Sequence, residues 1–89
     1  MPQFHLTRKV QDFLLYIYEK GQITRKTQPF YTFSMSYYMM ISYLKNLGLI
    51  VQNGFTENNE KIWVLSEKGK RVCSLLKKIR KLMEGENGR

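Results

Sequence analysis

The sequence contains one cysteine, one histidine and seven acidic residues among its 89, and these shortages exclude several classes of protein. One cysteine rules out an intrachain disulfide framework and any cysteine-rich zinc site. With one histidine, no Ser/His/Asp set or Cys/His pair with orienting neighbours can be assembled convincingly, and no phosphate-cradling glycine loop is present. We therefore expect a protein that is not an enzyme, with no metal, no cofactor and no small-molecule ligand.

The chain also lacks long hydrophobic runs. No apolar segment approaches the roughly 18 residues that a membrane-spanning helix needs. The first residues, "MPQFHLTRK", have no apolar stretch of the kind found in a signal peptide. We therefore expect a cytoplasmic protein that is not inserted in a membrane.

Hydrophobic and basic residues are the abundant classes. Hydrophobic residues make up 43% of the chain and aromatic residues 13%, which is enough for a packed core. A chain of 89 residues cannot bury enough surface for two cores, so we expect one domain. Fifteen Lys and Arg against seven Asp and Glu give a net charge of +8. This charge indicates a polyanionic partner, either nucleic acid or an anionic membrane surface.

Apolar residues at helical spacing predict a first helix, which begins after the capping residue Thr7 and ends at Gly21. These residues are Val10, Phe13, Leu14 and Ile17. Residues 1–6 precede the helix, and we expect them to form an N-terminal arm.

The segment 22–33 is the hardest part of the chain to interpret. Pro29 prevents an uninterrupted helix there, so we expect one or two irregular turns. The sequence leaves open whether Thr24 caps a short helix or Pro29 begins one that runs through Phe33.

A second helix is predicted from about residue 34 to residue 47. Ser34 and Ser36 are both good N-capping residues, and Gly48 is suited to the left-handed conformation that ends a helix. Four apolar residues recur at i, i+3, i+4 and i+7 and should form its buried stripe. They are Tyr37, Met40, Ile41 and Leu44.

The rest of the chain reads as a hairpin followed by a helix. The β-prone runs "LIVQN" and "KIWVL" flank a loop rich in turn-forming residues, which predicts an antiparallel pair of strands. Ser66 then caps a final helix that carries an apolar stripe and is predicted to end near Glu84. Residues 85–89 should be a disordered tail, so that residues 7–84 form the single α+β domain.

Two motifs resemble a known family. The run "YLKNLGLI" at 43–50 and the run "VLSEKGK" at 64–70 are similar to those of the winged helix-turn-helix in small prokaryotic and archaeal transcription regulators, including MarR-type and archaeal viral regulators. The resemblance implies a helix, a short irregular helix or turn, a recognition helix, a two-stranded wing and a C-terminal helix. It also implies that the helix at 34–47 lies in the major groove of DNA and that the hairpin lies beside the adjacent backbone.

If the stripe of the second helix is buried, its opposite face supplies candidate contacts to bases. The candidates on this helix are Ser34, Ser36, Tyr38, Met39, Ser42 and Tyr43. These side chains suit thymine methyl groups and hydroxyl hydrogen bonds, which predicts a site with A·T-rich central steps. The alternative is that this face packs against the irregular segment or a partner chain.

The candidate phosphate contacts lie mostly outside that helix. They are Arg25, Lys26, Lys45 and Lys61, with Asn58 and Asn59 at the tip of the wing. Glu57 and Glu60 flank the two asparagines and repel phosphate, so we expect the tip to touch DNA weakly or not at all.

The resemblance further implies that the terminal helix pairs with a second copy of the chain. The expected homodimer interface comprises Val72, Cys73, Leu76, Ile79 and Met83. Cys73 is then either an intersubunit disulfide or, as we prefer, a small buried thiol.

The function that the resemblance implies is sequence-specific binding of double-stranded DNA by a homodimeric transcription regulator. Repression is favoured over activation, because a chain this short has little surface left for recruiting polymerase. The alternatives are a protein–protein interaction module that uses the same fold, and an RNA-binding protein.

Overall fold

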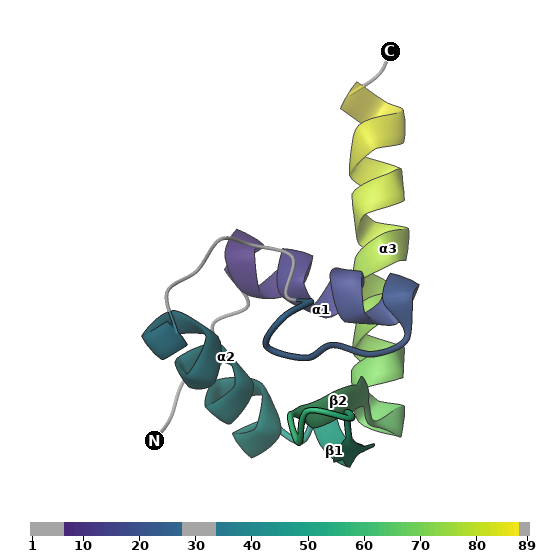
Figure 1. Cartoon of the computed structure of the whole chain (residues 1–89). Coiled ribbons are helices and arrows are strands. Elements are labelled where there is room, and N and C mark those ends of the chain that lie inside the picture. The colour runs from purple at the N-terminus through teal and green to yellow at the C-terminus, as the bar shows by residue number, and fades with distance from the viewer. Residues whose placement is uncertain (1–6, 28–33, 88–89) are drawn as a thin grey trace.

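The computed structural model describes residues 7–27 and 34–87 of the chain, and it has the α+β architecture predicted from the sequence (Figure 1). Its elements, in chain order, are α1 (Arg8–Lys20), α2 (Ser34–Asn46), β1 (Ile50–Phe55), β2 (Lys61–Leu65) and α3 (Glu67–Asn87). The predicted arm at residues 1–6 lies outside the described residues, as does the segment 28–33. The predicted helix, recognition helix, hairpin and terminal helix are all present.

Helix α1 begins and ends where local chemistry predicts. The Thr7 hydroxyl accepts a hydrogen bond from the backbone N–H of Val10 at 3.3 Å. Gly21 ends the helix in a left-handed conformation with φ of 93°, and its N–H bonds to the carbonyl of Ile17. The four residues of the predicted stripe are all buried in the core: Val10, Phe13, Leu14 and Ile17.

The sheet contains one connection that the sequence did not reveal. Strands β1 and β2 form an antiparallel hairpin in which Ile50 lies opposite Leu65. On the other side of β2, Ile23 exchanges two backbone hydrogen bonds with Trp63, at 2.9 and 3.0 Å. The sequence predicted irregular turns throughout 22–33, but Ile23 adds one strand-like residue to the sheet. The chain after α1 is therefore anchored to β2.

The end of α2, the start of β1 and the start of α3 meet in a compact junction. Gly48 has φ of 77°, which allows the chain to leave α2 and enter β1. The Ser66 hydroxyl donates to the carbonyl of Gly48 at 2.5 Å and accepts from the N–H of Gly69 at 3.0 Å. The N–H of Ser66 also donates to the carbonyl of Leu49 at 2.9 Å. The two sequence motifs therefore bond directly to each other.

Close packing at this junction requires Gly69 to have no side chain. A Cβ atom at this position would overlap the carbonyl oxygen of Leu49 and also crowd the side chain of Leu65. Glycine is unfavourable inside a helix by about 1 kcal/mol relative to alanine. Here its presence allows the first turn of α3 to lie against the backbone of Leu49, just before β1.

Helix α3 packs against α1 as far as Arg80, and its last turns project beyond the rest of the fold (Figure 1). Cys73 is fully buried there, and its thiol donates to the carbonyl of Leu14 at 3.4 Å. Arg80 ties the two helices together farther along, with Nη2 at 2.8 Å from Asp12 Oδ1. The helix runs to Asn87, so the sequence placed its end too early at Glu84 and counted residues 85–87 wrongly as tail.

The position of α1 corrects the interface expected on α3. Cys73 and Leu76 face the core, with 0% and 8% of their surface exposed, so neither is available to a second copy. Val72 is partly buried against the same core. Ile79 and Met83 are exposed, as the prediction required. The Cys73 thiol is buried, as the preferred interpretation expects.

Candidate nucleic-acid interface

Helix α2 has a buried side and an exposed side, close to those predicted. Tyr37, Ile41 and Leu44 are buried in the core. Tyr38 and Met39 are exposed over 55% and 63% of their surface. Ser42 and Lys45 are exposed on the same side of the helix, whereas the side chains of Ser34 and Ser36 lie outside the described residues. The predicted outward face therefore exists from Tyr38 to Lys45.

Tyr43 departs from the predicted pattern. It is half-buried and packs against the core together with Met40 and Leu47. These three residues are spaced by three and four positions, so they share one flank of the helix. Tyr43 is thus an edge residue rather than a member of the exposed face.

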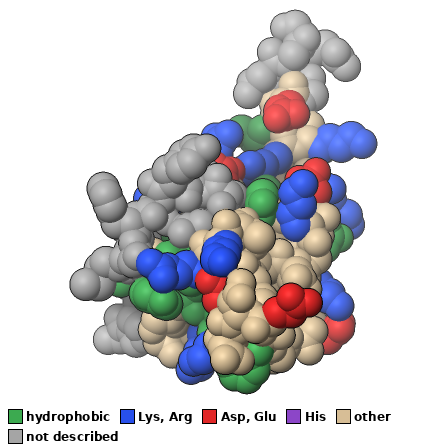
Figure 2. Space-filling model, in the orientation of Figure 1, with side chains coloured by type: hydrophobic (Ala, Val, Ile, Leu, Met, Phe, Trp, Pro, Cys, Tyr) green, Lys and Arg blue, Asp and Glu red, His purple; other side chains and the backbone are tan. Residues whose placement is uncertain are grey.

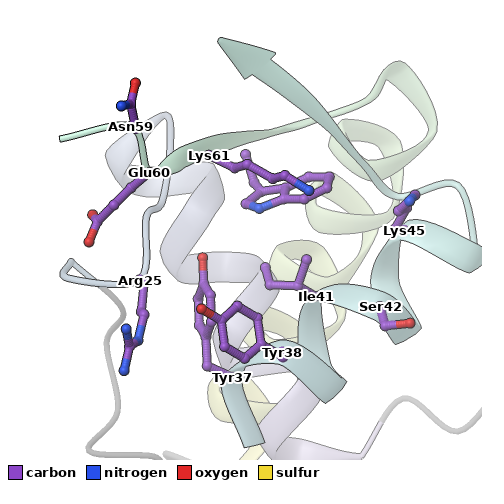
Figure 3. A pocket seen from close by; sticks show the side chains of 10 residues that line it. Arg25, Tyr37, Tyr38, Ile41, Ser42, Lys45, Asn59, Glu60 and Lys61 are labelled. Atoms are coloured by element: carbon purple, nitrogen blue, oxygen red, sulfur yellow. The ribbon is translucent and has the colours of Figure 1, made fainter. Parts of the chain in front are cut away.

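The exposed side of α2 borders a groove of about 490 Å³, which also involves the turn after α1 and the end of the wing (Figure 3). Six of the twelve predicted nucleic-acid-binding residues line it: Arg25, Tyr38, Ser42, Lys45, Asn59 and Lys61. They come from segments far apart in the sequence and are brought together by the fold. We name this feature the α2–wing groove.

A threonine-closed turn holds Arg25 at one side of the α2–wing groove. The N–H of Thr24 donates to the Thr27 hydroxyl at 2.9 Å, and the N–H of Thr27 donates to the Thr24 carbonyl at 3.1 Å. Thr24 is buried and follows Ile23, whose backbone is bonded to Trp63. The exposed Arg25 and Lys26 therefore stand between two fixed threonines.

Three cationic side chains and one carboxylate set the electrostatics of the groove. Arg25, Lys45 and Lys61 line it, together with Glu60. The guanidinium carbon of Arg25 lies 6.0 Å from the centre of the Tyr38 ring, which is within the range of a cation–π contact. This excess of positive charge favours an anionic ligand, while Glu60 makes one part of the groove less favourable for phosphate.

Aromatic rings form the floor of the groove. Burial, followed by the neighbouring Tyr38 and Glu60, raises the pKa of the Tyr37 phenol to about 12, while Arg25 acts in the opposite direction. The Tyr37 phenol therefore stays neutral at physiological pH. Its ring meets that of Tyr38 edge to face, with centroids 5.5 Å apart. The groove thus offers a hydroxyl-bearing, partly apolar surface with cations around it.

Several residues depart from the predicted set. Lys26 and Asn58 are exposed but do not line the groove, and Met39 lies on the α2 surface beside it. Tyr37 and Ile41, which were predicted to lie in the buried stripe of α2, also line the groove, as does Trp63 of β2. Their apolar character gave no signal of this second role, which arises because the groove reaches down to the edge of the core.

The residues that the structure describes offer neither a metal site nor a membrane-spanning helix. Residues 7–27 and 34–87 contain no group of three or more His, Cys, Asp or Glu side chains that could hold a metal ion. Among the described helices, none is both long and apolar enough to cross a membrane.

Comparison with known proteins identifies the family. The model of the winged helix-turn-helix family matches residues 4–84, which is nearly the whole chain. The chain belongs to the winged helix-turn-helix family. No curated protein and no solved structure matches it. In the winged-helix arrangement α2 takes the place of the recognition helix and β1–β2 that of the wing. Membership indicates DNA binding, since the recognition helix of such proteins enters the major groove.

Proposed function

We propose that this winged-helix protein binds double-stranded DNA sequence-specifically and regulates transcription as a homodimer. The observation that carries the proposal is the α2–wing groove, where the exposed face of α2 is bordered by Arg25, Lys45 and Lys61. A helix that enters the major groove needs cations beside it to contact phosphates, because phosphate contacts position the protein on the duplex. Repression is the simpler outcome, since occupying a promoter requires DNA binding alone.

The chemistry of α2 favours A·T-rich steps under its centre. Tyr38, Met39 and Ser42 are exposed there, and none of them can form the two-pronged contact that an arginine makes with guanine. Methionine and tyrosine can pack against thymine methyl groups, and the hydroxyls can donate or accept hydrogen bonds. We therefore propose that α2 itself reads A·T pairs.

The dimer is proposed to form through the exposed apolar stripe of α3. This stripe comprises Leu75, Ile79, Leu82 and Met83, each with between 55% and 68% of its surface exposed. It keeps Ile79 and Met83 of the interface expected from the sequence, adds Leu75 and Leu82, and leaves out Val72, Cys73 and Leu76, which pack toward the core. Four large apolar side chains along one side of a projecting helix suit a two-helix contact between copies. Each copy would then present one recognition helix to one half-site.

The second candidate function is a protein–protein interaction module that docks a partner on Tyr38 and Met39. Charge placement separates the two functions, since a protein partner does not require cations on several sides of the α2 face. Arg25 and Lys61 come from different elements and border the same groove as Tyr38, which favours DNA. RNA is a weaker fit, because the deep, narrow major groove of an RNA duplex does not admit a helix.

The test is selection of bound sequences from a random pool of duplex DNA. The wild-type chain should enrich a pseudo-palindrome with A·T-rich steps in each half-site. The double variant Tyr38→Ala/Met39→Ala should retain weak binding and lose the preference at those steps. Tyr18→Ala is the matched control, because Tyr18 is an exposed tyrosine of α1 that lies under Lys77 and away from the groove. Wild-type protein that enriches no sequence would contradict the proposal.

A further inference from the structure

We infer that Arg25, which lies outside the recognition helix, reads a guanine at the edge of each half-site. This inference rests on the proposed DNA-binding function. It assigns to Arg25 the two-pronged guanine contact that the exposed side chains of α2 cannot make. Within α2 the exposed residues from Tyr38 to Ser42 carry no guanidinium, and Lys45 lies near the end of the helix. A guanine contact at the beginning of the helix must therefore come from another element.

The backbone of Arg25 is held in place before any ligand arrives. Two backbone hydrogen bonds join Ile23 to Trp63, and the Thr24 and Thr27 hydroxyls lie 3.1 Å apart in the closed turn. A side chain on a fixed backbone loses less conformational entropy when it binds than one on an irregular loop. Arg25 therefore has the anchoring that a base-reading residue needs.

The guanidinium of Arg25 is directed toward the exposed side of α2. It lies 6.0 Å from the centre of the Tyr38 ring, and Figure 3 shows the two side chains close together at one end of the groove. Tyr38 is the fifth residue of α2, in the half of a recognition helix that contacts base edges. At this distance the ring attracts the guanidinium through a cation–π contact, so Tyr38 acts as a positioning residue for Arg25.

The surroundings of Arg25 favour a base edge over a phosphate. Glu60 lines the same groove, and its carboxylate repels phosphate oxygens near Arg25. Lys45 lies toward the opposite end of the groove from Arg25, so it is placed for a different part of the DNA (Figure 3). Guanine presents two acceptors, O6 and N7, that match the paired N–H donors of arginine. A carboxylate nearby is also compatible with the paired cytosine, whose amino group donates.

The experiment compares two adjacent cations of the same turn. Arg25→Ala and Lys26→Ala each remove one positive charge from an exposed position, so both variants should fold, which thermal melting would check. Binding is measured to the selected duplex and to duplexes with each base pair changed in turn, at several salt concentrations. In wild type, one G·C pair per half-site should be preferred by about 5- to 150-fold, which is the usual range for a two-pronged contact.

Arg25→Ala should abolish the preference at that G·C pair and leave the preferences at the A·T steps unchanged. Lys26→Ala should weaken binding to all sequences alike and keep the G·C preference. Tyr38→Phe retains the aromatic ring and should keep the preference, whereas Tyr38→Leu should reduce it. The phenylalanine variant thus separates the contribution of the Tyr38 ring, which contacts Arg25, from that of its hydroxyl.

Three negative results would overturn different parts of this reasoning. Wild-type protein that binds no duplex DNA would overturn the proposed function itself. Wild-type protein that selects a sequence, together with an Arg25→Ala variant whose preferences match wild type at every position, would overturn only the assignment of Arg25. Equal effects of Arg25→Ala and Lys26→Ala on all sequences would likewise make Arg25 a phosphate contact and end the inference.

Discussion

Helices α2 and α3 both expose large apolar side chains, but their charges are arranged differently. On α2 the exposed side carries Tyr38 and Met39, and two of the cations beside it, Arg25 and Lys61, are supplied by other elements. On α3 the cations lie on the helix itself, and Figure 2 shows Lys and Arg side chains along its projecting part. The apolar stripe of α3 runs along the same helix, and Lys78 borders it at i+3 from Leu75 and i−4 from Leu82.

The difference indicates two kinds of contact. A surface whose cations converge from several elements onto one groove suits a curved polyanion such as a DNA backbone. A projecting helix with an exposed apolar stripe suits another helix, because the stripe can be covered while the long cationic side chains at its edges keep their charged ends in water.

The largest effect is expected from charging the α3 stripe. The double variant Ile79→Lys/Leu82→Lys should be monomeric, because two like-charged patches would face each other across the interface. Loss of the linked second half-site should weaken operator binding by about 10²- to 10⁴-fold. Light scattering after gel filtration measures the mass, and a titration with the operator measures the affinity. Added lysines alone would strengthen DNA binding, so a loss of affinity cannot be attributed to charge.

Glu84→Lys provides the matched control for this variant. It changes the charge by the same two units, and Glu84 is exposed on the same helix, on a side away from Ile79 and Leu82. This variant should remain dimeric. If both proteins have the same mass as wild type, the α3 stripe is not the interface between copies.

An intermediate effect is expected at the junction that joins the two helices. Gly69→Ala would normally stabilise a helix, but here the added methyl group must displace the backbone of Leu49. We expect the free energy of unfolding to fall by about 1–3 kcal/mol, as overpacking usually costs. Urea denaturation measures the change. Lys70→Ala, at an exposed position of the same turn, should stay within about 0.5 kcal/mol of wild type. A more stable Gly69→Ala protein would contradict the packing.

The smallest effect is expected from a change of pH. It involves one buried ionisable group on each helix, Cys73 on α3 and Tyr37 on α2. Burial raises the pKa of the Cys73 thiol from 9.0 to about 11, so the folded state favours the neutral thiol. The contribution of this group to the free energy of unfolding is therefore fully present below pH 9, and it is lost as the pH rises toward 11. The loss at pH 10 should be about 1 kcal/mol. Tyr37, with its higher pKa, adds its own loss between pH 10 and about 12.

Unfolding measured at several pH values from 7 to 10, in wild type and in Cys73→Ala, separates the two contributions. The alanine variant should show a flatter dependence over that range, whatever its stability at pH 7. Parallel curves for the two proteins would mean that the Cys73 thiol ionises as easily in the folded chain as in the unfolded one.

Much of the fold could be predicted because the deciding signals are local. Thr7 and Gly21 mark the ends of α1, and Gly48 ends α2, through backbone preferences that act over a few residues. The apolar spacing on α1 identified its buried residues for the same reason. The paired motifs around Leu49 and Ser66 reflect one local arrangement, the hairpin end that meets the capped helix.

The remaining features depend on contacts between distant residues. Ile23 and Trp63 form a bridge although they are 40 positions apart in the sequence. No periodicity in residues 22–27 predicts that bridge. Cys73 and Leu76 belong to the same helical pattern as Ile79, and the packing of α1 decides which of them are covered. The groove likewise forms because the turn at Arg25 and the wing approach α2, which depends on the complete tertiary fold.

The junction at Ser66 and Gly69 has a mechanical consequence. Because Gly48 and Leu49 are bonded to the first turn of α3, a rotation of α3 carries the end of α2 with it. In an assembly of two copies, the crossing angle of the terminal helices would then set the distance between the two recognition helices.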